Sequence, residues 1–206
     1  MYWKSWISVL KIIPTEWEIS LDSALKTGYR LIDTANAYFN EKAVGWAIKK
    51  SSIPRSDIFL SSKLYPSVYE NPTGIDETLD HLQLDCIDLL FLHQHAENYV
   101  AGYKQLEKAY KEKRIRSIWI SNFDREPLDK ILNKCEIKPH VIQVEAHPYF
   151  TQQQLQKNIK PYGTVFMGLY PLGHGDATLM NHEIFTQLAK KYHKSNAQII
   201  LRWRVQ

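Results

Sequence analysis

The sequence has few cysteines, no long apolar segment and no glycine-rich phosphate-binding motif. Its two cysteines, Cys86 and Cys135, are too few for a disulfide framework, so we expect a reduced cytoplasmic protein. No segment approaches the roughly 20 continuous apolar residues of a membrane helix. Lys4 and Lys11 interrupt the apolar N-terminal stretch, which argues against a signal peptide. These absences argue against a disulfide-rich secreted domain and against a membrane protein.

The charge balance is also nearly even. The chain has 26 basic and 22 acidic residues, and its net charge of +4 is too small and too scattered to indicate nucleic-acid binding. Hydrophobic residues make up 44% of the chain and charged residues 23%, which is ordinary for a globular protein. We therefore expect a single domain over residues 1–206 that is a monomer or a weak oligomer.

Short apolar runs alternate with amphipathic segments along the chain. The runs are spaced at intervals close to the roughly 30 residues of a βαβ unit, and they begin near Arg30, Ile58, Ile87, Ile115, Val141 and Thr164. Helices are predicted between them, over residues 17–27, 40–50, 99–111, 181–192 and 196–204. Thr151 with Gln154 resembles a capping box at the start of a further helix. Asn40 is a candidate N-cap.

The strand runs are apolar almost throughout, which is typical of a parallel sheet covered on both faces. Two architectures fit, a doubly wound open sheet and a (β/α)₈ barrel. An open sheet usually carries a glycine-rich turn, but the eight glycines form neither G-x-G-x-x-G nor G-x-x-x-x-G-K. Polar residues also end several successive strands rather than one switch point. We therefore predict an α/β fold of the (β/α)₈ TIM-barrel type.

This predicted barrel is incomplete. Only six strand runs are clear, whereas a barrel of this class has eight strands and about 250 residues. Residues 1–13 are a doubtful first strand, and the chain stops at Gln206 within or just after a helix, so the last strand and helix are expected to be missing. Two open sheet edges would make the chain marginally stable or prone to aggregation. Packing would be lost around Ile199, Ile200, Leu201 and Trp203.

Four polar residues end or follow three of the apolar runs. Asp33 closes residues 29–33, Tyr38 follows five residues later, Lys63 closes residues 58–63, and His93 closes residues 87–93. The carboxyl ends of parallel strands carry the chemistry of α/β enzymes. Each residue alone has an ordinary structural explanation, but a lysine among apolar residues is costly unless paired, and Asp33 is the natural partner. Together the four residues predict a proton-transfer site.

Several motifs follow one another in a recognisable order. They are GYRLIDTA at 28–35, AY at 37–38, NE at 40–41, SKL at 62–64, DLLFLH at 88–93, ISNF at 120–123 and QVEAHP at 143–148. In this order they resemble the aldo-keto reductase family, over residues from about 17 to the end. The resemblance implies a (β/α)₈ barrel that reduces aldehydes and ketones to alcohols with NADPH. A small carbonyl compound would then be the substrate.

The resemblance also implies roles for the four polar residues. Tyr38 would be the general acid that protonates the carbonyl oxygen as hydride arrives at carbon. Lys63 could lower the pKa of Tyr38, because a nearby cation favours the phenolate. Asp33 would hold Lys63 charged and oriented, and it is also assigned to the cofactor site. His93 would bind the substrate carbonyl and position it.

A second set of residues is assigned to NADP(H) by the same resemblance. Ser121, Asn122 and Gln143 match the positions that hold the nicotinamide carboxamide, a task suited to neutral donors and acceptors. The run that would border the nicotinamide contributes three further cofactor-binding residues, Leu169, Pro171 and Leu172.

The sequence departs from the family pattern at three of its positions. Leu169 replaces an aromatic residue that stacks on the nicotinamide, and Tyr170 replaces a serine. Trp119 stands where the family usually has a small glycine. These departures leave a second hypothesis open, in which the chain is a catalytically impaired or inactive remnant or a binding protein.

Features of two further enzyme classes are present in the sequence. His93-Gln94-His95 at one strand end, with His147 at another, is a pattern found in metal-dependent hydrolase barrels, since histidines at i and i+2 of a strand share a face. No metal role is evident for Lys63, however, and we predict no metal. A Schiff-base aldolase would use Lys63 as a nucleophile. Pairing with Asp33 would keep that lysine protonated.

Overall fold

The strands of this protein form one curved parallel sheet. The computed structural model describes residues 6–8, 14–123 and 125–205. Within these residues, seven strands lie side by side in chain order and every neighbouring pair is parallel. They are β1 (Trp6–Ser8), β2 (Leu31–Asp33), β3 (Phe59–Leu64), β4 (Leu89–Leu92), β5 (Ile118–Ser121), β6 (Val141–Glu145) and β7 (Val165–Leu169).

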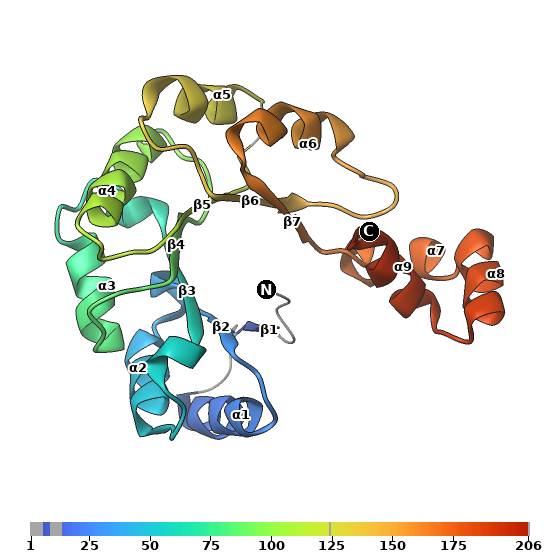
Figure 1. Cartoon of the computed structure of the whole chain (residues 1–206), viewed down its shortest axis with the longest axis horizontal. Helices are drawn as coiled ribbons and strands as arrows, with labels where there is room; N and C mark the ends of the chain where they lie inside the picture. Colours follow the sequence, from blue (N-terminus) through green and yellow to red (C-terminus); the bar gives the residue numbers. More distant parts are fainter. Residues whose placement is uncertain (1–5, 9–13, 124, 206) are drawn as a thin grey trace.

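The helices follow the strands and lie along the outer side of the arc that the sheet makes (Figure 1). The outer helices are α1 (Pro14–Lys26), α2 (Glu41–Lys50), α3 (Gly74–Leu82), α4 (Tyr99–Lys111), α5 (Arg125–Lys134) and α6 (Gln153–Ile159). After β7 come α7 (Ala177–Met180), α8 (Glu183–Tyr192) and α9 (Asn196–Arg204). Figure 1 shows these last three helices extending away from the arc. None of the helices in the described part of the chain is long and apolar enough to cross a membrane.

The predicted α/β fold, an incomplete (β/α)₈ TIM barrel, is therefore confirmed, and the doubtful first strand is present. Ile7 of β1 pairs with Ile32 of β2 in parallel register. In the described residues β1 and β7 each pair on one side, and no eighth strand joins them. The sheet is thus an open barrel whose inner face is not closed by its own strands.

Apolar side chains cover both faces of the sheet, as expected for parallel strands with helices on the outside. The outer face forms the larger core with the helices, and its strand residues include Ile32, Leu60, Leu90, Ile120 and Ile142. The inner face has a smaller core made of Leu89, Phe91 and Trp119, against which Phe59, Val141 and Met167 pack. Alternation of side chains between the two faces therefore places the functional residues on the inner side.

The predicted element boundaries differ from the observed ones where pairing begins irregularly. Two strand runs were expected to start at Ile87 and Ile115, but these residues form only an isolated parallel bridge, ahead of β4 and β5. The capping box expected at Thr151 is wrong, because α6 begins after Gln152, which has φ 57° and makes no side-chain cap. A capping box is found at Ser195, at the start of α9.

A cluster of charged residues joins the amino ends of the strands. The Asp88 carboxylate is buried and accepts hydrogen bonds from Arg55 at 2.6 Å, from Arg116 at 2.8 Å and from the backbone amide of Leu60 at 3.0 Å. Removing the carboxylate would leave these donors without their buried acceptor.

We expect Asp88→Ala to lower the free energy of unfolding by about 2 to 4 kcal/mol, since a partly buried charged network loses its central group. Urea unfolding followed by circular dichroism measures the loss. Asp22→Asn is the control, because it removes an exposed ion pair with Lys26 and should leave stability nearly unchanged. Equal effects of the two substitutions would contradict the role given to Asp88.

Within residues 6–8, 14–123 and 125–205, β7 has a strand partner on one side only, and this open edge predicts self-association. Val165 is 60% exposed at the start of this edge strand, and an open, apolar edge can pair with another chain. Val165→Lys should reduce the concentration-dependent growth in mass measured by light scattering. The matched control is Val205→Lys, since Val205 is 74% exposed but lies after α9. A mass that depends on concentration equally in all three proteins would exclude the β7 edge as the cause.

Candidate active site

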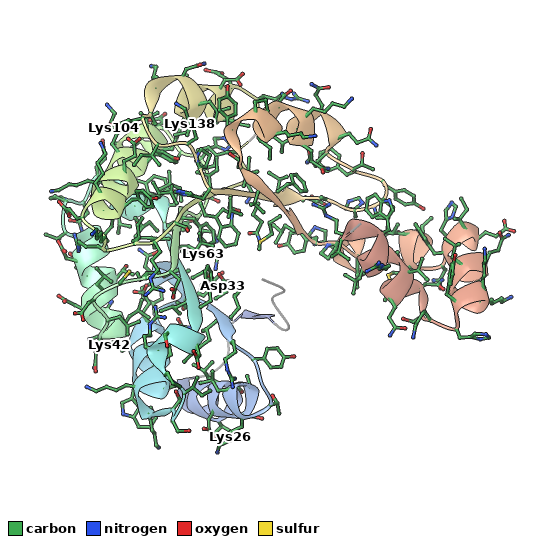
Figure 2. The ribbon with its side chains drawn as sticks, in the orientation of Figure 1. Lys26, Asp33, Lys42, Lys63, Lys104 and Lys138 are labelled. Carbon is green, nitrogen blue, oxygen red and sulfur yellow. The ribbon has the colours of Figure 1, made fainter. Side chains whose placement is uncertain are left out.

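A buried ion pair between β2 and β3 forms the centre of the site. The Lys63 ammonium lies 2.5 Å from the Asp33 carboxylate, and both side chains are less than one-tenth exposed. Figure 2 shows the two residues together on the inner side of the arc, while the labelled Lys26, Lys42 and Lys104 lie on its outer side. The expected pairing of Lys63 with Asp33 is therefore present.

Neighbouring groups fix this pair. Ser61, opposite Asp33 in the register of β2 and β3, donates a hydrogen bond to Asp33 at 2.7 Å. The Lys63 ammonium also donates to the backbone carbonyl of Thr34 at 2.8 Å. Burial lowers the pKa of Lys63, and the Asp33 carboxylate opposes that change. Asp33 thus stabilises the charged form of the Lys63 ammonium, which burial alone would disfavour.

Tyr38 lies beside the pair on a 3₁₀ turn, Asn36–Tyr38, that follows β2. The Lys63 ammonium is 4.9 Å from the centre of the Tyr38 ring. Burial, the Asp33 carboxylate and Tyr170 raise the pKa of Tyr38 to about 12. The pKa of Tyr38 is therefore raised and not lowered as expected, because burial and the negative charge of Asp33 both favour the neutral phenol.

His93 completes the cluster from the end of β4. Its ring meets those of Tyr38 at 6.1 Å and Tyr65 at 5.9 Å between centroids, both nearly perpendicular. Burial lowers the pKa of His93, and the positive charge of Lys63 lowers it further. The imidazole is therefore neutral at neutral pH. Its Nδ1 is buried and has no hydrogen-bond partner among the described residues.

The three residues assigned to the nicotinamide carboxamide also come together. Ser121 and Gln143 are register partners on β5 and β6, and both are buried. Asn122, at φ 59°, donates from its side chain to the Ser121 hydroxyl at 3.3 Å. The Gln143 amide donates to the Met167 sulfur at 3.2 Å. Because a thioether is a weak acceptor, a carbonyl oxygen would compete well for this amide.

The remaining assigned residues lie at the end of β7 and in the loop after it. Leu169 ends this strand, and its carbonyl accepts a hydrogen bond from the Ala146 amide at 3.0 Å. Pro171 lines a cavity of about 760 Å³ on the inner side of the sheet, and the Leu172 carbonyl accepts from the Gly175 amide. Tyr170, at φ 49°, stacks on the His174 ring at 3.6 Å. Its aromatic partner is thus within its own loop.

Three residues near the cluster were not singled out from the sequence: Ser61, Tyr65 and Phe91. Alternation along a strand could have found Ser61 and Phe91, because they stand two residues before Lys63 and His93. The Phe91 ring lies 5.0 Å from the Lys63 ammonium. Tyr65 lies just past β3, where no periodic pattern applies.

The histidine pattern does not make a metal site. His93 and His95 come after the end of β4 at Leu92, so they are not on one strand face as expected. His93 meets the Tyr38 ring, whereas the His95 Nδ1 lies 3.3 Å from the Asn122 carbonyl oxygen. Over residues 6–8, 14–123 and 125–205, no group of three or more histidine, cysteine, aspartate or glutamate side chains could hold a metal ion.

Comparison with known families identifies the fold and the motifs together. The sequence model of the Aldo/keto reductase family matches residues 12–206. The chain belongs to this family. Solved aldo/keto reductases share its structure. The one from Brucella melitensis has a TM-score of 0.87 and 35% identity, over 97% of this chain and 78% of that chain. The enzyme MGS-M4, from a Medee basin deep-sea metagenome library, has a TM-score of 0.87 and 32% identity, over 97% and 76%.

Curated members of the family are also similar in sequence. Glyoxal reductase of Bacillus subtilis is 41% identical over 191 residues, which cover 91% of this chain and 68% of that protein. The 9,11-endoperoxide prostaglandin H2 reductase of Trypanosoma cruzi is 36% identical, over 89% and 66%. Methylglyoxal reductase DkgA of Yersinia pestis is 34% identical, over 92% and 70%. The chain therefore spans about two thirds of the length of these relatives.

The electrostatics of the cluster predict how Tyr38 titrates. Tyr38 should still be protonated at the ordinary tyrosine pKa of 10.0, and Asp33→Asn should lower its pKa, since removing a negative charge favours the phenolate. Carbon-13 NMR of labelled tyrosines, with Tyr38→Phe to assign the signal, measures both values. Asp22→Asn should not move it. A Tyr38 signal that titrates at the same pH with and without Asp33 would rule out this coupling.

Proposed function

We propose that this chain reduces small aldehydes and ketones to alcohols with NADPH, with Tyr38 as the general acid. The observation that carries the proposal is the cluster in which the buried Asp33–Lys63 pair meets the half-buried Tyr38 and His93 at three strand ends. Family membership supports the reaction class. The domain would comprise residues 1–206, in the reducing cytoplasm that its two free cysteines fit.

Proton transfer would run from the Tyr38 hydroxyl to the carbonyl oxygen. With a pKa raised to about 12, Tyr38 is protonated at neutral pH and can donate. The alkoxide that forms as carbon is reduced is a much stronger base than a phenolate, so the transfer remains favourable. The Lys63 ammonium, 4.9 Å from the ring, would stabilise the phenolate left behind. Asp33 keeps that ammonium charged.

His93 would orient the substrate. A neutral imidazole can donate a hydrogen bond to a carbonyl oxygen without delivering a full charge. The rings of Tyr38 and Tyr65 border it and restrict where the carbonyl group can lie. His93 would thereby set the carbonyl oxygen within reach of the Tyr38 hydroxyl.

The residues of β5 and β6 fit a nicotinamide carboxamide. Gln143 can exchange its weak bond to the Met167 sulfur for one to a carbonyl oxygen, and the Ser121 and Asn122 side chains can accept and donate at the amide nitrogen and oxygen. NADPH, when bound, supplies the hydride. Asp33, Leu169, Pro171 and Leu172 complete the cofactor-binding residues that we propose.

The relatives point to the substrate class. The names of two similar curated proteins are glyoxal reductase and methylglyoxal reductase. We propose glyoxal and methylglyoxal as test substrates, since both are small carbonyl compounds that need little of the chain beyond the cluster to hold them.

Tyr38→Phe tests the proposal. It should lower kcat for methylglyoxal reduction by about 10²- to 10⁴-fold, because the proton donor is lost while the ring remains. Quenching of tryptophan fluorescence by NADPH should be retained. Tyr192→Phe is the control, since Tyr192 is 56% exposed on α8. Unchanged turnover in Tyr38→Phe, or no quenching by millimolar NADPH in the unmodified chain, would refute the proposal.

A cofactor-binding protein without turnover is the second candidate. It is favoured by Leu169 and Tyr170, which differ from the family pattern beside the cofactor, and by the pKa of Tyr38, which is raised rather than lowered. Quenching by NADPH with no reduction of either carbonyl compound would support this candidate over the enzyme.

A further inference from the structure

Three residues form one row across the inner face of the sheet. Lys63 of β3 pairs with Phe91 of β4, and Phe91 pairs with Trp119 of β5. Partners in adjacent parallel strands point to the same face. Trp119, the third residue of this row, stands where the family usually has a glycine. The row therefore brings an aromatic pair against the lysine of the site.

The contacts within the row are close. The Lys63 ammonium lies 5.0 Å from the centre of the Phe91 ring and 4.9 Å from the centre of the Tyr38 ring. Phe91 in turn stacks on Trp119, with 4.1 Å between centroids and 28° between planes. Phe91 is 0% and Trp119 1% exposed. The face of an aromatic ring attracts a cation, so the stacked pair gives the buried ammonium a favourable neighbour that does not titrate.

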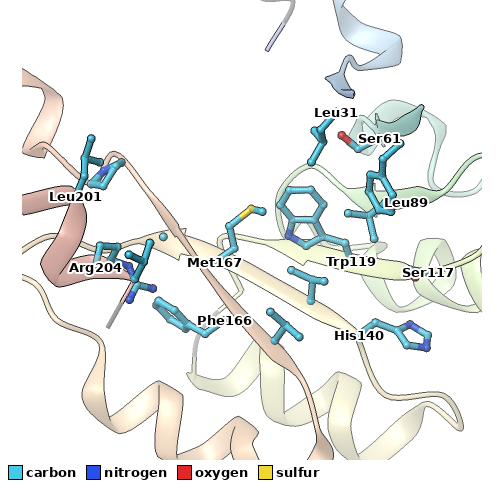
Figure 3. A pocket seen from close by; sticks show the side chains of 16 residues that line it. Leu31, Ser61, Leu89, Ser117, Trp119, His140, Phe166, Met167, Leu201 and Arg204 are labelled. Atoms are coloured by element: carbon cyan, nitrogen blue, oxygen red, sulfur yellow. The ribbon is translucent and has the colours of Figure 1, made fainter. Parts of the chain in front are cut away.

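A large cavity lies on the other side of this pair. Its volume is about 760 Å³, and Trp119 lines it together with Leu89 and Met167 (Figure 3). Lys63 and Phe91 are not among the described residues that line it. Trp119, which stacks on the Phe91 ring beside the ammonium, is therefore part of the cavity wall, as is Ser61 two residues before Lys63. Its Nε1 is buried and has no hydrogen-bond partner in the described part of the chain.

Because the barrel is open, separation of the Lys63 ammonium from the adjoining cavity matters for the ion pair. The interaction of Lys63 with Asp33 is strong because both are buried, and water beside the ammonium would weaken it. We propose that Phe91 and Trp119 form an aromatic plug, which holds the Lys63 ammonium against Asp33 and Tyr38 and shields it from the adjoining cavity. Its catalytic consequence rests on the proposed carbonyl reduction, whereas the shielding does not.

Chemical reactivity of Lys63 tests the shielding directly. Acetylation by an N-hydroxysuccinimide ester, followed by peptide mass spectrometry, should be slow at Lys63 in the unmodified chain. In Trp119→Gly it should be about tenfold faster, because the amine becomes reachable without local unfolding. Trp119→Phe should restore most of the protection, since a ring remains. Trp203→Gly is the matched control, because Trp203 is 39% exposed on α9.

A second variant keeps the test decisive if Trp119→Gly does not fold. Phe91→Leu retains an apolar residue of similar size but removes the ring beside the ammonium, and it should also speed acetylation of Lys63. Circular dichroism checks that each variant is folded. Unchanged protection of Lys63 in a folded Trp119→Gly or Phe91→Leu chain would overturn the aromatic plug.

Turnover separates this proposal from the one on which it builds. In an active chain, Trp119→Gly should shift the pH profile of kcat and lower kcat more than it raises KM, because the substrate contacts are intact. Trp119→Phe should reverse most of this change. If Lys63 reactivity rises but no chain reduces methylglyoxal, the aromatic plug stands and the reductase proposal fails. If turnover is present and Lys63 reactivity does not change in the variants, the reductase proposal stands and the aromatic plug fails.

Discussion

The ion pair between Asp33 and Lys63 is the interaction on which the site depends. A lysine ammonium buried inside the arc of the sheet is costly unless a carboxylate meets it, and Asp33 does so at 2.5 Å. The position of this ammonium then sets the surroundings of Tyr38 and His93. It lies 4.9 Å from the centre of the Tyr38 ring, and its charge adds to burial in lowering the pKa of His93. The strands deliver these groups, but the ion pair decides their chemical state.

Much of this arrangement could be predicted from the sequence. Unbroken apolar runs at regular intervals predicted the parallel sheet, and polar residues at the ends of those runs predicted that Asp33, Lys63 and His93 would meet. The chemical state of the site was harder to predict. The pKa of Tyr38 depends on which hydrogen bonds Lys63 makes and on how deeply the phenol is buried, and neither quantity is written in residue spacing. The capping box predicted at Thr151 is wrong for a similar reason: Gln152 occupies the N-cap position of α6, and its side chain donates to the Glu145 carbonyl and does not cap the helix.

The inner face of the sheet shows how members of one family can keep the same fold with different side chains inside the barrel. Family motifs place Ser121 and Gln143 in one layer of the sheet, and this chain keeps them. One layer below, Trp119 fills space that a glycine would leave empty and stacks on Phe91. A bulky side chain at that point changes the volume and the dielectric environment beneath the site without changing any of the groups that would touch a substrate. Differences between members of the family at such positions can therefore alter reactivity indirectly.

Because β3, β4 and β5 pair in a fixed parallel register, a shift of one residue in a single strand would alter the site. Inner and outer residues alternate, so Phe91 faces the site while Leu90 and Leu92 face the helices. Deleting one residue between Asp88 and Phe91 would exchange the inward-facing and outward-facing residues of the strand, so that aliphatic side chains would face Lys63. The hydrophobicity of the strand would hardly change, although a phenylalanine would then have to fit an outer core packed around leucine side chains. The order of residues along β4, more than its composition, thus decides whether an aromatic or an aliphatic side chain faces Lys63.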